Sequence, residues 1–262
     1  MAQITPPNAP VERLRAAGCV FAEDEARLLT AAARDVEHLE VMLGRRIAGE
    51  PLEYVLGWAE FAGLRIAVSP GVFVPRPRSE FLVTEAAGLL PPAVVVLDLC
   101  CGSGAIGAAL LTARPGLTLV AADVDPAAVE CARRNLPPGT AVVEGDLFDP
   151  VPAELRGGLA MIIANAPYVP TAEIPLLPAE ARMHEALRAL DGGTDGLELH
   201  RRIAAEARAW LAPGGRLLIE TSERQAPIAA AIFACHGLTP EIRRSEELDA
   251  TVVIGVRSAP SG

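Results

Sequence analysis

The stretch LAMIIANAPY, residues 159–168, decides which fold we expect for this chain of 262 residues. Its first six residues are apolar and predict a buried strand, and Asn165 with Pro167 is typical of a turn at the strand's end. In open α/β sheets, ligands bind at the carboxyl ends of the strands. An Asn at that end offers an oxygen that accepts a hydrogen bond and an NH₂ group that donates one. We therefore expect the reacting group to be held by Asn165, Ala166, Pro167 and Tyr168.

Apolar runs of the same kind alternate with helical segments on both sides of this stretch. Besides 159–164, strands are predicted at 94–97, 117–122, 141–143, 216–220, 239–243 and 251–256, and helices at 81–90, 105–112, 126–136, 199–211 and 226–236. Continuous apolar strands that alternate with helices indicate an α/β fold with a doubly wound, mostly parallel sheet, here of seven strands. The last two strands would add an antiparallel pair at its edge.

The remaining segments suggest how the chain divides. Val36, Leu39, Leu43 and Ile47 recur at helical spacing, so the N-terminal part is predicted to be helical. The long insertion at 169–197 is expected to face the substrate. The predicted parts are a helical domain at 1–57 that begins with a flexible tail at 1–10, a hairpin linker at 58–75, a catalytic α/β domain at 76–257 and a tail at 258–262.

Composition disfavours several classes of protein. The chain is 51% hydrophobic and 21% charged, which allows a sizeable core. We find no apolar run long enough to cross a bilayer and no N-terminal secretory signal. Five cysteines without zinc-ligand spacing fit a reduced, cytoplasmic protein with neither disulfides nor a metal site. A net charge of −10, the absence of lysine and the scattered arginines make direct nucleic-acid binding an unlikely role.

A glycine loop follows the first strand of the predicted sheet and reads DLCCGSGAIG, residues 98–107. Glycines here would let the backbone turn tightly and approach a ligand at a helix N-terminus. Cys100 stands where a dinucleotide enzyme would have its first glycine, and Asp98 would suit a cationic ammonium group better than a pyrophosphate. The adjacent cysteines lack C-x-x-C spacing and are interpreted as small loop residues near the ligand. The cofactor-binding residues predicted in this loop are Asp98, Cys100, Cys101, Gly102, Ser103 and Gly104.

Two more acidic residues follow the next two strands. Asp123 is placed to accept hydrogen bonds from ribose hydroxyls, and Asp146 could receive an adenine amino group while Leu147 covers the ring. Each acid alone could be a helix cap, a turn residue or a surface charge. Three acids after three successive strands instead predict a pocket for an adenosine with a cationic tail. S-adenosyl-L-methionine has that shape and is the predicted cofactor, which we expect to contact Asn165 as well.

These motifs together resemble those of the class I S-adenosylmethionine-dependent methyltransferases, which are Rossmann-like, and among them the HemK/PrmC family. The resemblance runs from about Arg45 to Gly255, most of the chain. Its matching segments are VPRP with Ser79-Glu80 for the PRP-x-[TS]-E signature, residues 98–106 for the cofactor loop, residues 165–168 for the NPPY motif, and residues 190–197 for a further family segment.

The resemblance implies methylation of the side-chain amide nitrogen, N5, of a glutamine in a protein, usually in the Gly-Gly-Gln loop of a peptide-chain release factor. The Asn165 oxygen and the Ala166 carbonyl would each accept one N–H of that amide, and Tyr168 would form a wall of the slot. The chain departs from the family pattern at Ala166, where a Pro is usual, and at Glu185-Ala186, where Glu-Pro is usual.

Other interpretations remain open at this point. The same chemistry could act on another amide or amine, in a different protein, a peptide or a small molecule. A nucleic-acid base is a further acceptor class, because NPPY-like motifs are shared with adenine- and cytosine-amino methyltransferases. A cofactor-binding module without catalysis is the non-enzyme alternative.

Overall fold

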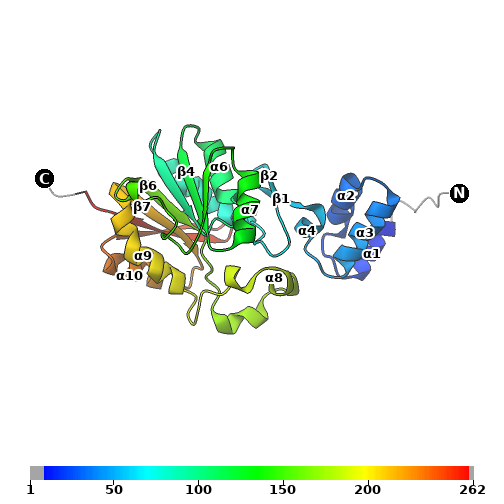
Figure 1. Ribbon diagram of the computed structural model, residues 1–262. Helices are drawn as coiled ribbons and strands as arrows, with labels where there is room; N and C mark the ends of the chain where they lie inside the picture. Colours follow the sequence, from blue (N-terminus) through cyan, green and yellow to red (C-terminus); the bar gives the residue numbers. More distant parts are fainter. Residues whose placement is uncertain (1–8, 260–262) are drawn as a thin grey trace.

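A computed structural model describes residues 9–259 and shows a central sheet with helices on both faces (Figure 1). Its strands run in the order β5-β4-β3-β6-β7-β9-β8. From β5 to β7 all neighbours are parallel, and β9 is antiparallel to both β7 and β8. The seven strands are β3 (Val95–Leu99), β4 (Thr118–Asp123), β5 (Ala141–Glu144), β6 (Leu159–Ala164), β7 (Leu211–Thr221), β8 (Thr239–Ser245) and β9 (Ala250–Val256). The predicted α/β class with a doubly wound, mostly parallel sheet is confirmed.

The last two strands form the antiparallel pair that the sequence predicted at the edge of the sheet. Within this pair β9 lies next to β7 and β8 is the outermost strand, an order that the sequence left open. The burial of the two strands explains this order. Every residue of β9 except Val256 is buried, whereas no residue of β8 is fully buried. The more apolar strand therefore takes the interior place, and the more polar strand forms the edge.

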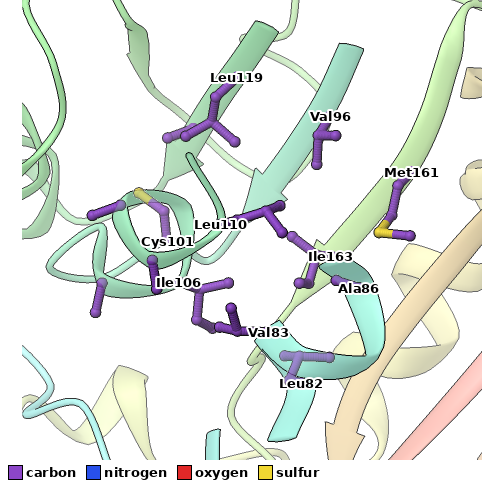
Figure 2. Close-up of a cluster of buried hydrophobic side chains, with 14 of the residues drawn as sticks. Leu82, Val83, Ala86, Val96, Cys101, Ile106, Leu110, Leu119, Met161 and Ile163 are labelled. Carbon is purple, nitrogen blue, oxygen red and sulfur yellow. The ribbon is translucent and has the colours of Figure 1, made fainter. Parts of the chain in front are cut away.

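Two groups of helices cover the two faces. The first group is α5 (Glu80–Leu89), α6 (Ala105–Ala113) and α7 (Pro126–Asn135), and the second is α9 (Glu198–Trp210) and α10 (Ala226–Cys235). On the first face Ile163 and Met161 pack with Leu82 and Leu110, as Figure 2 shows. Ile162 belongs to the core of the opposite face. Successive residues of β6 thus point to opposite sides of the sheet, which explains its unbroken apolar run.

The N-terminal helices gather away from the sheet at one end of the molecule (Figure 1). They are α1 (Ala9–Ala16), α2 (Ala22–Ala32), α3 (Val36–Ile47) and α4 (Leu52–Leu56). Their core includes Leu14, Leu29 and Leu43. Ala9 and Pro10 are helical rather than part of a tail; the rest of that predicted tail, and residues 260–262 of the C-terminal one, lie outside the described residues.

A short hairpin, β1 (Trp58–Phe61) and β2 (Leu64–Ala67), connects the helices to the sheet. It is shorter than the predicted 58–75, because residues 68–75 form no further strand and make only an isolated bridge from Gly71 to Glu185. The insertion at 169–197 holds α8 (Ala179–His184) and two 3₁₀ turns, Thr171–Leu176 and Leu187–Ala189. The division of the chain into domains stays a prediction. None of the helices between residues 9 and 259 combines the length and apolar character that crossing a membrane requires.

Candidate active site

The carboxyl ends of the central strands open into one cavity of about 760 Å³. The strand registers place the residues at this edge in a row. Leu99 pairs with Ala122 on one side and Ala164 on the other, and Ala164 pairs with Ile219. The next residue along each strand therefore brings four side chains to the same edge, in the order Asp123, Cys100, Asn165 and Glu220. All four line the cavity, together with residues of the 71–79 segment and of the insertion.

The glycine loop lines the cavity through an unusual run of backbone angles. Cys100, Gly102 and Gly104 have φ values of 55°, 54° and 76°, in the left-handed region that favours glycine. Gly104 also packs closely, because a Cβ there would lie 3.1 Å from the Cα of Ala132. A Cβ on Gly102 would meet open space. The loop therefore presents bare backbone to the cavity at Gly102.

Asp98 does not line the cavity, although the sequence suggested a direct contact with a ligand. Its side chain is fully buried behind the loop, where Oδ2 accepts a hydrogen bond of 3.1 Å from the Gly107 N–H. Oδ1 is buried and makes no hydrogen bond to a described residue. Burial raises the pKa of Asp98 to about 7, and the Asp123 carboxylate adds to that rise. Asp98 thus stabilises the start of α6, directly after the glycine loop, through this hydrogen bond and does not face the cavity.

Asp123 and Asp146 have different surroundings on the cavity wall. The Asp123 carboxylate accepts the Gly102 N–H at 2.8 Å and the Asp125 N–H at 2.9 Å, so it fixes the glycine loop; burial raises its pKa. The exposed Asp146 carboxylate accepts a hydrogen bond of 2.7 Å from Arg202. Leu147 has a φ of 48° and is nearly buried, so the chain turns sharply there and leaves an apolar side chain on the wall.

The two cysteines sit in a negative environment. Burial and the nearby Asp123 and Asp98 carboxylates raise the pKa of the Cys100 thiol, and burial with the same two carboxylates raises that of Cys101. A reactive cysteine needs a lowered pKa, so neither thiol is suited to be a nucleophile. The same field favours a cationic ligand over a phosphate.

The turn after β6 is held by a group of polar side chains from distant segments. Asn165 Nδ2 donates a hydrogen bond of 3.0 Å to the Ser79 hydroxyl, and the Tyr168 hydroxyl donates one of 3.1 Å to Glu220 Oε1. Burial raises the pKa of Glu220, while hydrogen bonding from Ser79 and Tyr168 opposes that rise. Ala166 is almost fully buried, whereas Asn165 and Tyr168 are half-buried and reach the cavity.

The backbone of this turn is clamped by the glycine-rich end of the insertion. Gln225 Nε2 donates hydrogen bonds of 2.9 Å to the carbonyls of Tyr168 and Asp195. A Cβ on Gly192 would lie 2.7 Å from the Pro167 carbonyl oxygen, and one on Gly196 only 2.2 Å from that of Tyr168. Only glycine fits this close approach of two backbones, which explains the glycines of the 190–197 segment.

A second clamp joins the segment before α5 to the insertion. Arg76, which lines the cavity, forms an ion pair with the buried carboxylate of Glu185, and the Val74 N–H donates to the same oxygen at 3.4 Å. Ala186 stands beside this pair, and its N–H donates to the Gly71 carbonyl at 3.2 Å. A proline in its place has no N–H for that bond.

Comparison with known proteins places the chain in a family. The family model described as Methyltransferase small domain matches residues 64–196. A release factor glutamine methyltransferase of Geobacter sulfurreducens is 40% identical over 199 residues, which cover 75% of this chain and 69% of that protein. A release factor glutamine methyltransferase of Caulobacter vibrioides is 31% identical, over 96% of this chain and 95% of that protein. The chain belongs to the release factor glutamine methyltransferase family.

A solved structure supports the same fold. A methyltransferase from Pyrococcus furiosus superposes with a TM-score of 0.56 at 20% identity, covering 75% of this chain and 90% of that one. The predicted resemblance to this family is confirmed by the relatives, and the superposition supports the fold.

The site contains further residues that the sequence did not single out, three of which contact the predicted acceptor turn or lie beside it. They are Ser79, Glu220 and Gln225. Glu220 carried a usable signal, because it follows the apolar run 217–219 in the same way as Asp123 follows its strand. Ser79 lay within the quoted signature but was assigned no role. Nothing in the local sequence around Gln225 indicates its contact with Tyr168.

Proposed function

We propose that the chain transfers a methyl group from S-adenosylmethionine to the side-chain amide nitrogen of a glutamine in a peptide-chain release factor. The family membership supports the activity class. The observation that carries the proposal is that Asn165 and the glycine loop share one cavity wall. A cofactor bound at the loop would be next to an acceptor bound at Asn165.

The cavity fits the proposed cofactor in size and charge. Its 760 Å³ lies within the range of small-molecule sites. Gly102 would allow close approach of the cofactor, Asp123 would accept hydrogen bonds from its ribose, and Leu147 with Asp146 would hold the adenine. The carboxylates along the strand ends suit a sulfonium and would repel a pyrophosphate. When bound, S-adenosylmethionine supplies an electrophilic methyl group.

The acceptor half must align a weak nucleophile, because an amide nitrogen shares its lone pair with the carbonyl. We propose that Asn165 Oδ1 and the Ala166 carbonyl each accept one N–H of the glutamine amide. Two fixed acceptors orient the nitrogen toward the methyl group, a proximity effect. They also stabilise the positive charge that develops on the nitrogen during attack. The excess proton then leaves to water, so no strong base is required.

The direct test uses the full chain, methyl-labelled cofactor and a purified release factor, with the product mapped by mass spectrometry. We expect methylation at the glutamine of the Gly-Gly-Gln loop and none when that glutamine is replaced by alanine. Asn165→Ala should lower kcat by about 10²-fold or more, since it removes one of the two acceptors, and leave cofactor affinity within about threefold. Cofactor binding without methylation of the glutamine would argue against the release-factor substrate.

A different amide or amine acceptor is the second candidate, favoured by Ala166. An alanine at that position adds a backbone N–H that the family's proline lacks, and it fixes φ less strongly. Methylation of a protein or peptide other than a release factor, under the same assay, would select this alternative. Loss of activity after nuclease treatment would instead point to a nucleic-acid acceptor. A cytoplasmic location and independence from metal stay predictions.

A further inference from the structure

The short helix α8 forms part of the cavity wall but has no hydrophobic anchor. Pro178, Glu180 and Ala181, at its start, line the cavity, and none of its six residues is buried. A helix this short is marginal in water, because helices in proteins are stabilised mainly by the packing of an apolar face. Contacts other than apolar packing therefore have to hold α8 at the cavity.

Arg46 of α3 connects the start of α8 to the N-terminal helices. Its guanidinium donates hydrogen bonds of 2.6 and 3.1 Å to Glu25 of α2 and one of 2.6 Å to Glu180 of α8. The side chains of Arg46 and Glu25 are only 9% and 10% exposed, so they form a fixed, buried pair, whereas that of Glu180 is 46% exposed. Glu180 thus joins the cavity wall to a cation that the N-terminal helices hold in place.

The residue that follows α8 has a second contact of the same kind. Glu185 forms an ion pair with Arg76, from the segment before α5. α8 is therefore held at its two ends by the pairs Arg46–Glu180 and Arg76–Glu185. In Figure 1, α8 lies below the sheet, toward the N-terminal helices. Its position depends on both of these parts of the chain.

We propose that Arg46 and Glu180 are positioning residues for the acceptor, because they fix α8 in the cavity wall. The proposal rests on the proposed function, which places the acceptor in this cavity. A loosened α8 would have to be ordered when the acceptor binds, and this entropic cost lowers acceptor affinity. Asn165 and the glycine loop lie on other elements, so cofactor binding and the transfer step stay nearly unchanged. No residue of α1 to α4 lines the cavity, so these helices influence the acceptor through Arg46.

Hydrogen exchange of the full chain, followed by mass spectrometry, tests this contact without any acceptor. Glu180→Ala removes the carboxylate that Arg46 binds, so amide exchange over residues 179–186 should become about two- to fivefold faster, the range expected for a partly exposed ion pair. Exchange in α2 and α3 should stay as in the parent, because Arg46 keeps its hydrogen bonds to Glu25. Glu180→Gln keeps a side-chain oxygen for Arg46 and should lie between the parent and Glu180→Ala.

Glu40 supplies the matched control, and kinetics supply the second readout. The Glu40 side chain pairs with Arg13 at 2.7 Å and is 44% exposed, close to Glu180, but both partners belong to the N-terminal helices. With a release factor as acceptor, Glu180→Ala should raise the KM for the acceptor about two- to fivefold. Its kcat and cofactor affinity should stay within about 1.5-fold of the parent. Glu40→Ala should match the parent in exchange over residues 179–186 and in all three kinetic quantities.

Unchanged exchange over residues 179–186 in Glu180→Ala would overturn the proposal, and so would a lowered kcat with an unchanged KM for the acceptor. The same changes in Glu40→Ala would also overturn it, since they would show a general loss of stability. If the parent enzyme binds cofactor but methylates no glutamine, the proposed function fails. The exchange result still decides whether Arg46 and Glu180 hold α8 at the cavity.

Discussion

Gly107 offers a sharp test of how the cofactor loop is held. It lies in α6, without a positive φ, so an alanine there meets no backbone strain. An added Cβ would nevertheless lie 2.6 Å from Leu119 Cδ2, 3.1 Å from Asp98 Oδ2 and 3.3 Å from Leu136 Cδ2. Leu119 is itself buried in the core between α6 and the sheet (Figure 2). The neighbours therefore have little room to yield.

Two opposing effects set the size of the change. Replacing glycine by alanine inside a helix stabilises it by roughly 0.5–1 kcal/mol through backbone entropy. Overpacking a buried site costs typically about 1–3 kcal/mol. The short contact with Leu119 makes the second effect larger, so we expect Gly107→Ala to lose about 1–2 kcal/mol of unfolding free energy. Cofactor affinity should fall as well, because the Gly107 N–H holds Asp98 behind the loop.

Gly88 supplies the matched control. It lies in α5 on the same face of the sheet, is exposed, also lacks a positive φ, and a Cβ there would meet nothing within 4 Å. Gly88→Ala should therefore stabilise the protein by up to about 1 kcal/mol. Urea unfolding measures both variants from the midpoint at unchanged m. A Gly107→Ala protein as stable as Gly88→Ala would refute the packing argument.

Two further predictions concern buried charges. The folded parent keeps a proton on Asp98 up to a pKa of about 7, whereas the unfolded chain releases it near 3.8. The free energy of unfolding of the parent therefore falls as pH rises from about 4 to about 7. Asp98→Asn lacks this loss, so its stability relative to the parent should increase across the same range. Urea midpoints across that pH range test the sign. Arg46→Ala should lower the free energy of unfolding by about 3–5 kcal/mol. Arg46 donates buried hydrogen bonds of 2.6 and 3.1 Å to Glu25 and one of 2.6 Å to Glu180. Glu180→Ala removes the more exposed partner and should lower the free energy of unfolding much less in the same assay.

The alternation of apolar and polar segments was enough to predict the sheet. β6 is apolar on both faces, and β3 is apolar except for Asp98. Both are flanked by turn residues, and this pattern is typical of a parallel sheet in α/β proteins. The pattern did not predict which of β8 and β9 lies at the edge. Both segments are strands, and they differ in how deeply they are buried in the folded sheet.

Asp98 shows why a strand-end acid need not reach the ligand. Successive strand residues point to opposite faces. Leu97 and Leu99 pack in the core beneath α9 and α10, so Asp98 between them points to the other face, toward α6. Its sequence position is right for the edge of the sheet, but its side chain is turned away from the cavity. The period of the strand, counted from Leu97, would have predicted this.

The acceptor side of the site depends on register, which no local motif contains. Asn165 lies beside Glu220 because Ala164 pairs with Ile219, and a slip of one residue would turn β7 over. Ser79 comes from a segment 86 residues before Asn165. The Asn-Ala-Pro-Tyr motif is therefore enough to predict that residues 165–168 hold the acceptor, but it does not indicate which side chains surround them. The folded chain adds Ser79, whose hydroxyl accepts from Asn165 Nδ2 at 3.0 Å, and places Glu220 on the neighbouring strand.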